Sequence, residues 1–405
     1  MKPDGSKIAL SVAALVLYLL SAGLAFAAFS YFRPATAVTT VTDKTANGKF
    51  VPPKEKYAGL PKTEACPLNG AMYSQPEKDL WSQRRPLGIM VENAKPARPQ
   101  SGLSMADIVY EAVAEGGISR FMAVFYCQNS DIVGPVRSAR TYYLDWISEY
   151  ADFPLYAHVG GANTPGPADA LGQITRYGWE GFNDLNQFSV GFPTFWRDYE
   201  RLGADTATEH TMYTSTKKLW DFAAAKRGLT NVSVDDATGK QVSWDAGFVP
   251  WKFKDDAPLD QRPAKLSAQF ALSGIQASYS DDYVVLWQYD HDSNSYLRFN
   301  GKAEHRDMDT NQQLVAKNVV LEFTTMSVAD DGYNEEGHGQ HTLYGTKGNG
   351  RAKFLIDGKV IDGTWSKPTR VSRTTFKDSR GNEIKFNRGQ IWIEVLPIGQ
   401  PVTIS

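Results

Sequence analysis

Hydrophobic residues follow three different patterns along this chain. From Ile8 to Phe32 the sequence is almost continuously apolar. From about residue 85 to 228, short apolar runs typical of strands alternate with stretches whose apolar residues recur at helical spacing. From about residue 270 onward, short strands separated by turn residues dominate. This order predicts an α+β protein, with an N-terminal mixed α/β domain followed by a mainly antiparallel β domain.

These patterns divide the chain into five segments. Residues 1–33 form a membrane anchor or signal segment, 34–64 a flexible tether, 65–228 the α/β domain, 229–268 a connecting segment and 269–405 the β-rich domain. In the α/β domain we expect strands at 87–92, 108–115, 118–126 and 154–159, and helices at 138–150, 167–177 and 216–227. In the β-rich domain the clearest expected strands are 283–289, 315–323, 351–356 and 391–396.

Two glycine-containing turns predict hairpins. Asp357-Gly358 follows one short strand and precedes another, which is typical of a tight turn. Gly116-Gly117 separates two apolar runs and predicts a two-residue hairpin loop. The register that this loop imposes would place Glu111, Glu115 and Arg120 on one face of the hairpin.

The apolar segment at the N-terminus predicts export. About 20 apolar residues are enough to cross a bilayer as a helix. Lys2 and Lys7 precede the segment and favour a cytoplasmic N-terminus with the bulk of the chain outside the cytoplasm. Ala25-Phe26-Ala27 resembles a cleavage site, so a cleaved signal peptide is the alternative to a retained single-pass anchor in the cell membrane. No Cys follows the apolar run closely, which excludes a lipid anchor of the bacterial lipoprotein type.

Composition further limits the partners, the disulfides and the metal sites that the chain can have. The net charge is −2 over 405 residues, and no dense run of Lys and Arg occurs, so we expect no nucleic-acid partner. Cys66 and Cys127 are the only two cysteines. In an oxidising compartment they could form one disulfide, while a buried free Cys127 is the alternative. Two cysteines without neighbouring histidines do not make a zinc site.

The candidate chemistry centres on two arginines. Arg137 and Arg140 fall in the first turn of the helix expected at 138–150. Cations are unfavourable there, because the N-terminal amides of a helix already carry partial positive charge. The arrangement therefore predicts a bound anion, either a protein carboxylate or a phosphate or carboxylate ligand. Ser138 and Thr141 offer hydroxyl donors, and Gly160-Gly161 would let a ligand approach the backbone closely.

The competing interpretation is an internal network of salt bridges, in which Asp107, Glu111 or Glu115 satisfies the arginines. His158 ends an expected strand just before the glycine pair, where open sheets tend to bind ligands, although a buried structural histidine fits the pattern equally well. The candidate ligand-binding residues are Asp107, Glu111, Arg120, Arg137, Ser138, Arg140, His158, Gly160 and Gly161.

Other motifs predict neither a metal site nor a cofactor. Ser215–Lys218 has the S-x-x-K spacing of penicillin-binding enzymes but lacks their partner motifs, so we expect Ser215 to begin a helix as its cap. Asp290–Asn294 begins like a calcium loop, but it lacks the glycine and glutamate required further on and indicates a hairpin turn. His338 and His341 lie in an acidic stretch that we interpret as a solvated loop. P-loop, HExxH, G-x-S-x-G and dinucleotide motifs are missing.

Several segments resemble the YerB-like bacterial family. They are 85–93 (RPLGIMVEN), 97–103 (ARPQSGL), 106–111 (ADIVYE), 134–140 (GPVRSAR), 158–161 (HVGG), 358–367 (GKVIDGTWSK) and 389–393 (GQIWI). The resemblance covers about 85 to 400 and implies two domains, a cell-envelope location and no established reaction. Many members are lipoproteins, and this chain differs because it lacks the lipid-acceptor Cys. It also carries Glu209-His210-Thr211 where a Pro-His-Asn-like run is expected.

Three hypotheses about function follow. The first is an exported, membrane-tethered protein that binds an anionic envelope ligand, such as an envelope glycan or another envelope protein, through the arginine-rich start of the helix. The second is a hydrolase or transferase that acts on a phosphate- or carboxylate-bearing glycan, with Asp107, Glu111 or His158 as acid or base. The third is a structural scaffold whose charges are all paired internally. Whether Arg137 and Arg140 are exposed to solvent or paired within the protein distinguishes these three hypotheses.

Overall fold

The computed structural model describes residues 57, 59–150, 152–234, 238–272, 281–333 and 340–405. The expected anchor at 1–33, most of the tether at 34–64, and His338 therefore lie outside the described residues. Within the described part, no helix is both long enough and apolar enough to cross a membrane. Leu60–Ser405 group together as one unit, and the account below concerns that unit alone.

A ten-stranded sheet runs through this unit and takes strands from both halves of the chain. Its order is β23 (Thr375–Asp378), β22 (Lys359–Lys367), β21 (Gly348–Ile356), β18 (Asn318–Thr324), β25 (Ile391–Pro397), β4 (Ile108–Val113), β5 (Ser119–Phe125), β3 (Leu87–Glu92), β6 (Leu155–His158) and β7 (Asp184–Asn186). Near the C-terminus of the chain, β25 pairs in parallel with β18 on one side and β4 on the other. The last long strand therefore joins the two halves of the sheet.

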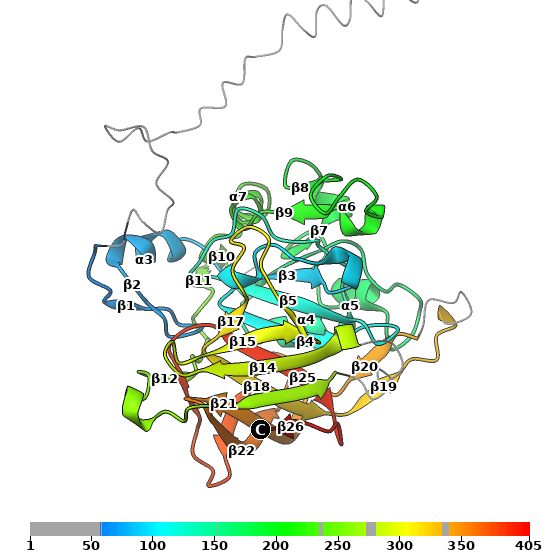
Figure 1. Ribbon diagram of the computed structural model, residues 1–405. Helices are drawn as coiled ribbons and strands as arrows, with labels where there is room; N and C mark the ends of the chain where they lie inside the picture. Colours follow the sequence, from blue (N-terminus) through cyan, green and yellow to red (C-terminus); the bar gives the residue numbers. More distant parts are fainter. Residues whose placement is uncertain (1–56, 58, 151, 235–237, 273–280, 334–339) are drawn as a thin grey trace, which may run out of the picture. The chain divides into compact units, whose positions relative to one another are not determined.

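A smaller sheet covers one face of the large sheet. It consists of β16 (Ala303–Glu304), β15 (Ser295–Asn300), β14 (Val284–Asp290), β13 (Ser267–Ala271) and β26 (Thr403–Ile404), with β17 (Val315–Ala316) also paired to β15. Apolar side chains fill the space between the sheets, and the Trp287 and Trp392 rings meet there at 5.3 Å. Figure 1 shows the smaller sheet in front of the larger one.

Helices cover the opposite face. Tyr110 and Met122 of the large sheet point to this side, and Trp146 of α4 stacks on Tyr110 with ring centroids 5.8 Å apart. The helices on this side are α3 (Gln75–Trp81), α4 (Thr141–Ile147) and α5 (Ala170–Arg176). The short α6 (Gln187–Val190) follows β7, and α7 (Thr216–Arg227) packs Leu219 and Ala223 into the core on the side of the smaller sheet. The central strands are buried along their whole length because both faces are covered.

Short strand pairs complete the structure. They are β1 (Glu64–Ala65) with β2 (Met72–Tyr73), β8 (Phe195–Arg197) with β9 (Met212–Thr214), β10 (Val232–Val234) with β11 (Gln241–Ser243), β12 (Lys252–Lys254) with β24 (Lys385–Asn387), and β19 (Met326–Val328) with β20 (Thr342–Tyr344). The α+β fold class predicted from the sequence is confirmed. The turn at Asp357-Gly358 also forms as predicted, with Ile356 opposite Lys359.

The predicted register of the first hairpin is wrong by one residue. Ala112, rather than Val113, lies opposite Arg120, and Glu111 lies opposite Phe121. The backbone N–H of Ala114 donates to the carbonyl of Ile118, so residues 115–117 form a three-residue loop in place of the expected two-residue loop. A shift of one residue moves side chains to the other face of a strand. Glu111 therefore faces the smaller sheet, whereas Arg120 faces the helices.

A disulfide joins Cys66 and Cys127, so the alternative of a free buried cysteine is wrong. The two residues are 61 positions apart in the sequence, and both are buried. Closing a loop of that length is expected to stabilise the fold by about 4 kcal/mol through the lost entropy of the unfolded chain. The bond holds the β1–β2 segment against the end of β5.

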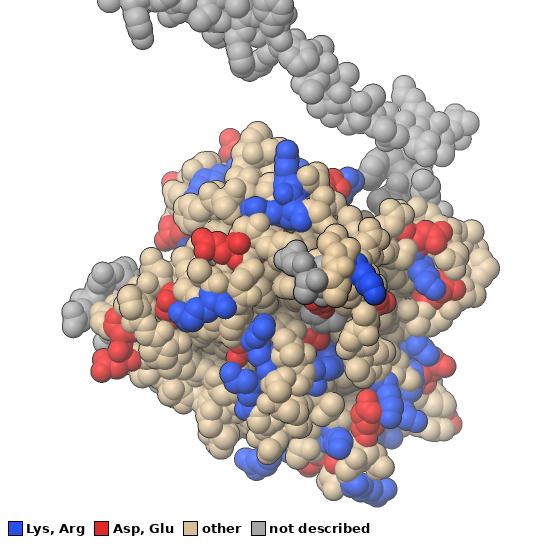
Figure 2. All heavy atoms as spheres, turned by 180° about the vertical axis from the view of Figure 1, so that it is seen from behind, with Lys and Arg blue, Asp and Glu red and all other residues tan. Residues whose placement is uncertain are grey.

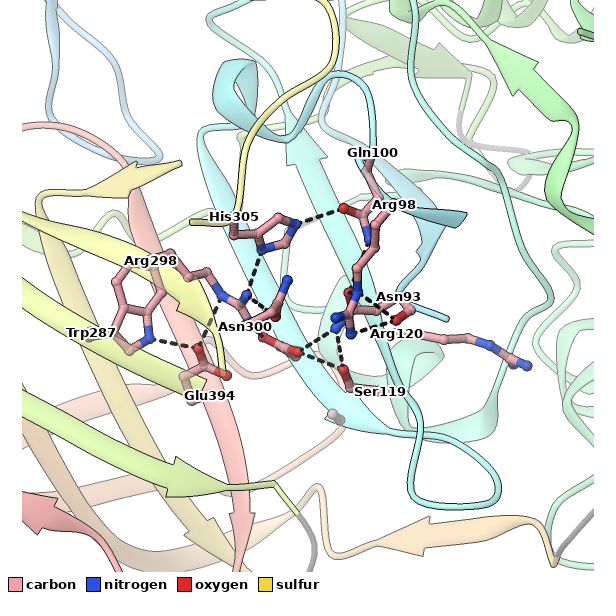
Figure 3. A network of polar contacts seen from close by, with 12 residues as sticks. Asn93, Arg98, Gln100, Ser119, Arg120, Trp287, Arg298, Asn300, His305 and Glu394 are labelled. Carbon is pink, nitrogen blue, oxygen red and sulfur yellow. Dashed lines mark hydrogen bonds and ion pairs between the residues drawn. The ribbon is translucent and has the colours of Figure 1, made fainter. Parts of the chain in front are cut away.

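A buried ion pair connects the two sheets. Arg298 of β15 reaches the large sheet, where its guanidinium binds Glu111 of β4 and lies 3.9 Å from Glu394 of β25 (Figure 3). All three side chains are completely buried. Burial, together with the nearby charge of Glu111, raises the pKa of Glu394 well above its usual range, which favours its neutral form. Arg298 and Glu111 are therefore the charged pair at the centre of this cluster.

Two further side chains accept hydrogen bonds from Arg298. Asn300 accepts a hydrogen bond from the guanidinium at 2.8 Å, and His305 accepts one through Nδ1 at 2.5 Å. Burial and the charge of Arg298 lower the pKa of His305 well below its usual range, so the ring is neutral. With Nδ1 accepting, the proton lies on Nε2, which donates to the side-chain amide oxygen Oε1 of Gln100 at 2.7 Å. The network extends from β15 to the loop before β4.

Replacement of Arg298 by methionine should destabilise the fold by about 3–5 kcal/mol, because it leaves the buried carboxylate of Glu111 without its counter-charge. Urea denaturation measures the change in the free energy of unfolding. Arg306→Met is the matched control, since Arg306 pairs with Glu304 at the surface with 46% of its side chain exposed, and it should change stability by less than about 1 kcal/mol. Adding Glu111→Gln to the Arg298 variant should recover part of the loss. Equal effects of the Arg298 and Arg306 variants would contradict this role.

Candidate functional site

The segment that carries the two arginines is extended before it becomes helical. Arg137 donates its backbone N–H to Met90 at 3.0 Å and accepts from Val159 at 3.0 Å, and Ala139 donates to Gly160 at 2.9 Å. Helix α4 begins only at Thr141, with Arg140 as its N-cap residue. The prediction that both arginines lie in the first helical turn is therefore wrong. Neighbouring strands satisfy the backbone of residues 136–139 in an extended conformation.

Arg140 forms an ion pair with a carboxylate of the protein itself. Its Nε binds Glu115, and Arg120 binds the second oxygen of the same carboxylate at 2.9 Å. Burial alone would raise the pKa of Glu115, but the two guanidiniums outweigh it and lower the pKa to about 2. Only 6% of the Arg140 side chain and 10% of the Arg120 side chain are exposed. For these two arginines the anion is internal, and it is supplied by the hairpin loop.

Asp107 and Glu111 lie away from Arg137 and Arg140. Asp107 is fully buried beside the disulfide, where it accepts backbone hydrogen bonds from Tyr126 at 2.6 Å and Cys127 at 2.8 Å. Burial raises the pKa of Asp107 to about 6, although these N–H groups act in the opposite direction. Glu111 belongs to the Arg298 cluster, and Figure 3 shows Arg120 pointing away from that cluster.

His158 is a buried structural residue with both ring nitrogens engaged. Nε2 lies 2.6 Å from Asp184, and Nδ1 lies 2.6 Å from the carbonyl oxygen of Gly160. The side chain has no exposed surface. Gly160 adopts a left-handed conformation with φ of 58°, and a Cβ atom there would lie 3.1 Å from the ring of Phe188. Phe188 therefore covers the backbone that was expected to receive a ligand.

The side chain of Arg137 is partly exposed to solvent. Its Nε lies 3.2 Å from Glu92 at the end of β3, and the other carboxylate oxygen of Glu92 lies 2.8 Å from Nδ1 of His210. We call Glu92, Arg137 and His210 the Arg137 cluster. The Arg137 side chain is 28% exposed, compared with 5% for Glu92 and 10% for His210. Among the described residues, none accepts a hydrogen bond from its terminal guanidinium nitrogens.

The charge of the Arg137 cluster follows from its pairing. The hydrogen bond that Glu92 accepts from His210 raises the pKa of His210, and burial offsets this only in part. When His210 is protonated, two cations share one carboxylate, and one positive charge remains. Glu92 and His210 were not among the candidates from the sequence. Glu92 ends a predicted strand and His210 lies 118 positions later, so no local pattern connects them.

The weaker motifs take structural positions. Ser215 is the N-cap residue of α7 as predicted, although its side chain makes no capping hydrogen bond. Asp290 and Ser295 pair across the turn between β14 and β15, which confirms the expected hairpin. His341 is 2% exposed and its Nδ1 lies 2.7 Å from Asp331, so the expectation of a solvated side chain is wrong for this histidine. Its ring also stacks on Tyr333 at 4.0 Å.

Comparisons with known proteins agree with the resemblance seen in the sequence. Residues 72–230 match the family described as Protein of unknown function (DUF3048) N-terminal domain, and residues 275–393 match the corresponding C-terminal domain. "Putative lipoprotein YerB" of Bacillus subtilis (strain 168) is 27% identical over 356 residues, which cover 87% of this chain and 92% of that protein. The crystal structure of the YerB protein from Bacillus subtilis shares the fold, with a TM-score of 0.64 at 24% identity over 85% of this chain and 100% of that chain. The chain therefore belongs to the YerB-like family of two-domain proteins of unknown function.

Proposed function

We propose that this chain is an extracytoplasmic, membrane-tethered protein of the cell envelope that binds an anionic envelope ligand at the Arg137 cluster. The apolar run from Ile8 to Phe32 after two lysines supports the tether. The name of the Bacillus subtilis relative, a lipoprotein, also points to a membrane-attached protein. Because no cysteine follows the apolar run closely, the helix itself would be the anchor of this chain.

The excess positive charge of the Arg137 cluster carries the binding proposal. A guanidinium presents a planar fork of N–H donors that matches a carboxylate or phosphate. In Arg137 the Nε edge faces Glu92, which leaves the terminal nitrogens as donors for a second anion. Protonated His210 adds a second positive charge next to the same carboxylate. Glu92 balances only one of the two positive charges of Arg137 and protonated His210. An anionic group of a ligand would balance the other.

Binding fits the geometry better than catalysis. Asp107, Glu111 and His158, the acid or base candidates from the sequence, are fully buried. Each is held by groups of the protein itself. A general acid or base must come within hydrogen-bond distance of its substrate. The pairing of Arg120 and Arg140 with Glu115 is structural in the same way, so the scaffold hypothesis applies to that part of the site.

Sulfate should bind more tightly at pH 6 than at pH 8.5, because the charge of sulfate is constant over this range while His210 loses its proton. The pKa of His210 is raised in the folded protein, so its contribution is complete below about pH 6.5 and is lost as the pH rises through the folded-state value. Arg137→Gln should weaken binding by about 1.5–3 kcal/mol, the typical value of hydrogen bonds to charged groups. His210→Gln should remove the pH dependence. Calorimetric titration at constant ionic strength measures both effects.

Arg306→Gln is the control for the sulfate titration, since it removes an exposed arginine that also pairs with a glutamate. Its affinity for sulfate should match that of the unchanged protein at both pH values. General stabilisation by sulfate through exclusion from the protein surface would affect all variants alike. Equal binding by the Arg137 and Arg306 variants would rule out the Arg137 cluster as the anion site.

The proposed topology predicts that protease added to intact spheroplasts digests the chain beyond Arg33. The positive residues before the apolar run keep the N-terminus in the cytoplasm and export the rest. Immunoblotting of the digested membranes with an antibody against the C-terminus shows the loss of the full-length band. A cytoplasmic protein detected in the same samples is the control for intact membranes. Full-length protein that survives until detergent is added would contradict export.

A further inference from the structure

A cavity of about 490 Å³ lies where α4, α5 and the end of β20 meet, on the helix-covered side of the large sheet. This volume is in the range of ~300–1,000 Å³ that small-molecule sites occupy. Figure 2 views the molecule from behind and shows several Lys and Arg side chains gathered on the face seen there. None of the residues lining the cavity belongs to the Arg137 cluster. The cavity is therefore a second, independent candidate site.

A buried carboxylate organises the polar groups of the cavity. Asp145 of α4 is 6% exposed. One of its oxygens accepts hydrogen bonds from Tyr177 at 2.8 Å and Gln173 at 3.3 Å. The other accepts from Thr346 at 2.5 Å. Burial and the carboxylate of Asp145 raise the pKa of Tyr177 to about 12, so the phenol stays neutral and keeps its proton for this bond. The polar groups are thus held in place before any ligand binds.

Two flexible cations lie at the mouth of the cavity. The side chains of Lys347 and Arg176 are 54% and 61% exposed. Their existing ion contacts are long, at 3.5 Å from Lys347 to Asp145 and 3.6 Å from Arg176 to Asp169. Asp145 and Asp169 are mostly buried, but both accept other hydrogen bonds from the protein. Either cation can therefore turn to a ligand without leaving its carboxylate unpaired. Asp145 is the only acid among the lining residues, which include these two cations, and Asp169 lies beside Arg176 outside the lining.

Aromatic rings form its walls. Tyr142 and Tyr344 meet edge to face at 4.8 Å, and both line the cavity. The guanidinium of Arg370 lies 4.0 Å from the ring centre of Tyr177, which fixes that ring in position. A ligand that fits this lining must have an apolar face for the rings, hydroxyl groups for the amide and hydroxyls, and a negative group for the rim. A sugar ring that bears a carboxylate meets all three requirements.

We infer that the cavity between α4, α5 and β20 binds a carboxylated sugar. Its ring packs against the tyrosines, its hydroxyl groups exchange hydrogen bonds with Gln173 and Thr346, and its carboxylate pairs with Lys347 and Arg176. The inference does not depend on the Arg137 cluster, because the two sites share no residue.

Isothermal titration with two matched pairs of sugars tests the inference. The pairs are glucuronate against glucose, and N-acetylmuramic acid against N-acetylglucosamine, in which one member carries the carboxylate. The carboxylated member should bind about tenfold more tightly in each pair, since it gains a charge-assisted contact at the rim. Lys347→Gln combined with Arg176→Gln should reduce this preference to about onefold. Tyr177→Phe should weaken both members alike by several-fold, because it removes a hydroxyl and no charge.

Lys217→Gln is the matched control, because Lys217 is a 73% exposed lysine of α7 in an ion pair with Asp221. Its affinities should equal those of the unchanged protein. Two results would contradict the inference. One is the absence of binding by the carboxylated sugars at about 10 mM, and the other is a preference for the carboxylated member of each pair that persists when both cations are replaced. Binding that is kept in the double variant but lost in Arg137→Gln would place the sugar at the Arg137 cluster and would also overturn the inference.

Discussion

The structure depends on a cation that is buried between two sheets. Arg298 has no exposed surface, and its charge is balanced by Glu111, which is equally buried. Removing both charges from water costs several kcal/mol per ion, so each is tolerated only in the presence of the other. The three strands that supply Arg298, Glu111 and Glu394 come from widely separated parts of the chain. The pairing therefore favours one arrangement of the sheets, in which these strands meet.

This constraint links the two halves that the family matches treat as separate domains. Because β25 lies between β18 and β4, the large sheet is complete only when the C-terminal strand has joined the N-terminal half. Helix α4 then packs across β4 and β5, and each candidate site takes residues from this helix or from the extended segment before it. The extended segment before it presents Arg137, and Asp145 on the helix organises the cavity. The functional candidates are thus placed by a sheet to which both halves contribute.

Sequence patterns predicted the helices and strands better than the contacts between them. Apolar runs located the central strands, and α7 has the predicted bounds, with Gly228 in a left-handed conformation at its end. The predicted hairpin register was wrong because Glu115 belongs to the loop. The alternation of apolar residues does not show whether the loop has two residues or three. Helix α4 starts after both arginines because segments far away in the sequence hold the residues before it in an extended conformation. Local periodicity contains no information about such contacts.

Charge pairing was the least predictable feature. The sequence correctly indicated that arginines in this region need anions, and for Arg120 and Arg140 it included Glu115 among the possible partners. Glu92 and His210 meet from 118 positions apart, and Arg298 and Glu111 from 187. No single-sequence pattern reports on separations of that size. The cavity was missed for the same reason, since Asp145, Tyr177 and Thr346 lie on three different segments.

Native-state hydrogen exchange on the full chain, followed through a series of urea concentrations, tests the central claim most directly. If the buried ion pair and the shared sheet make the two halves one cooperative unit, the slowest amides of β4, β15 and β25 will exchange with the same opening free energy and the same dependence on urea. These values will equal those of global unfolding. Exchange of β14 and β15 at a clearly lower free energy than β4 and β5 would show that the smaller sheet opens on its own, and would contradict the account.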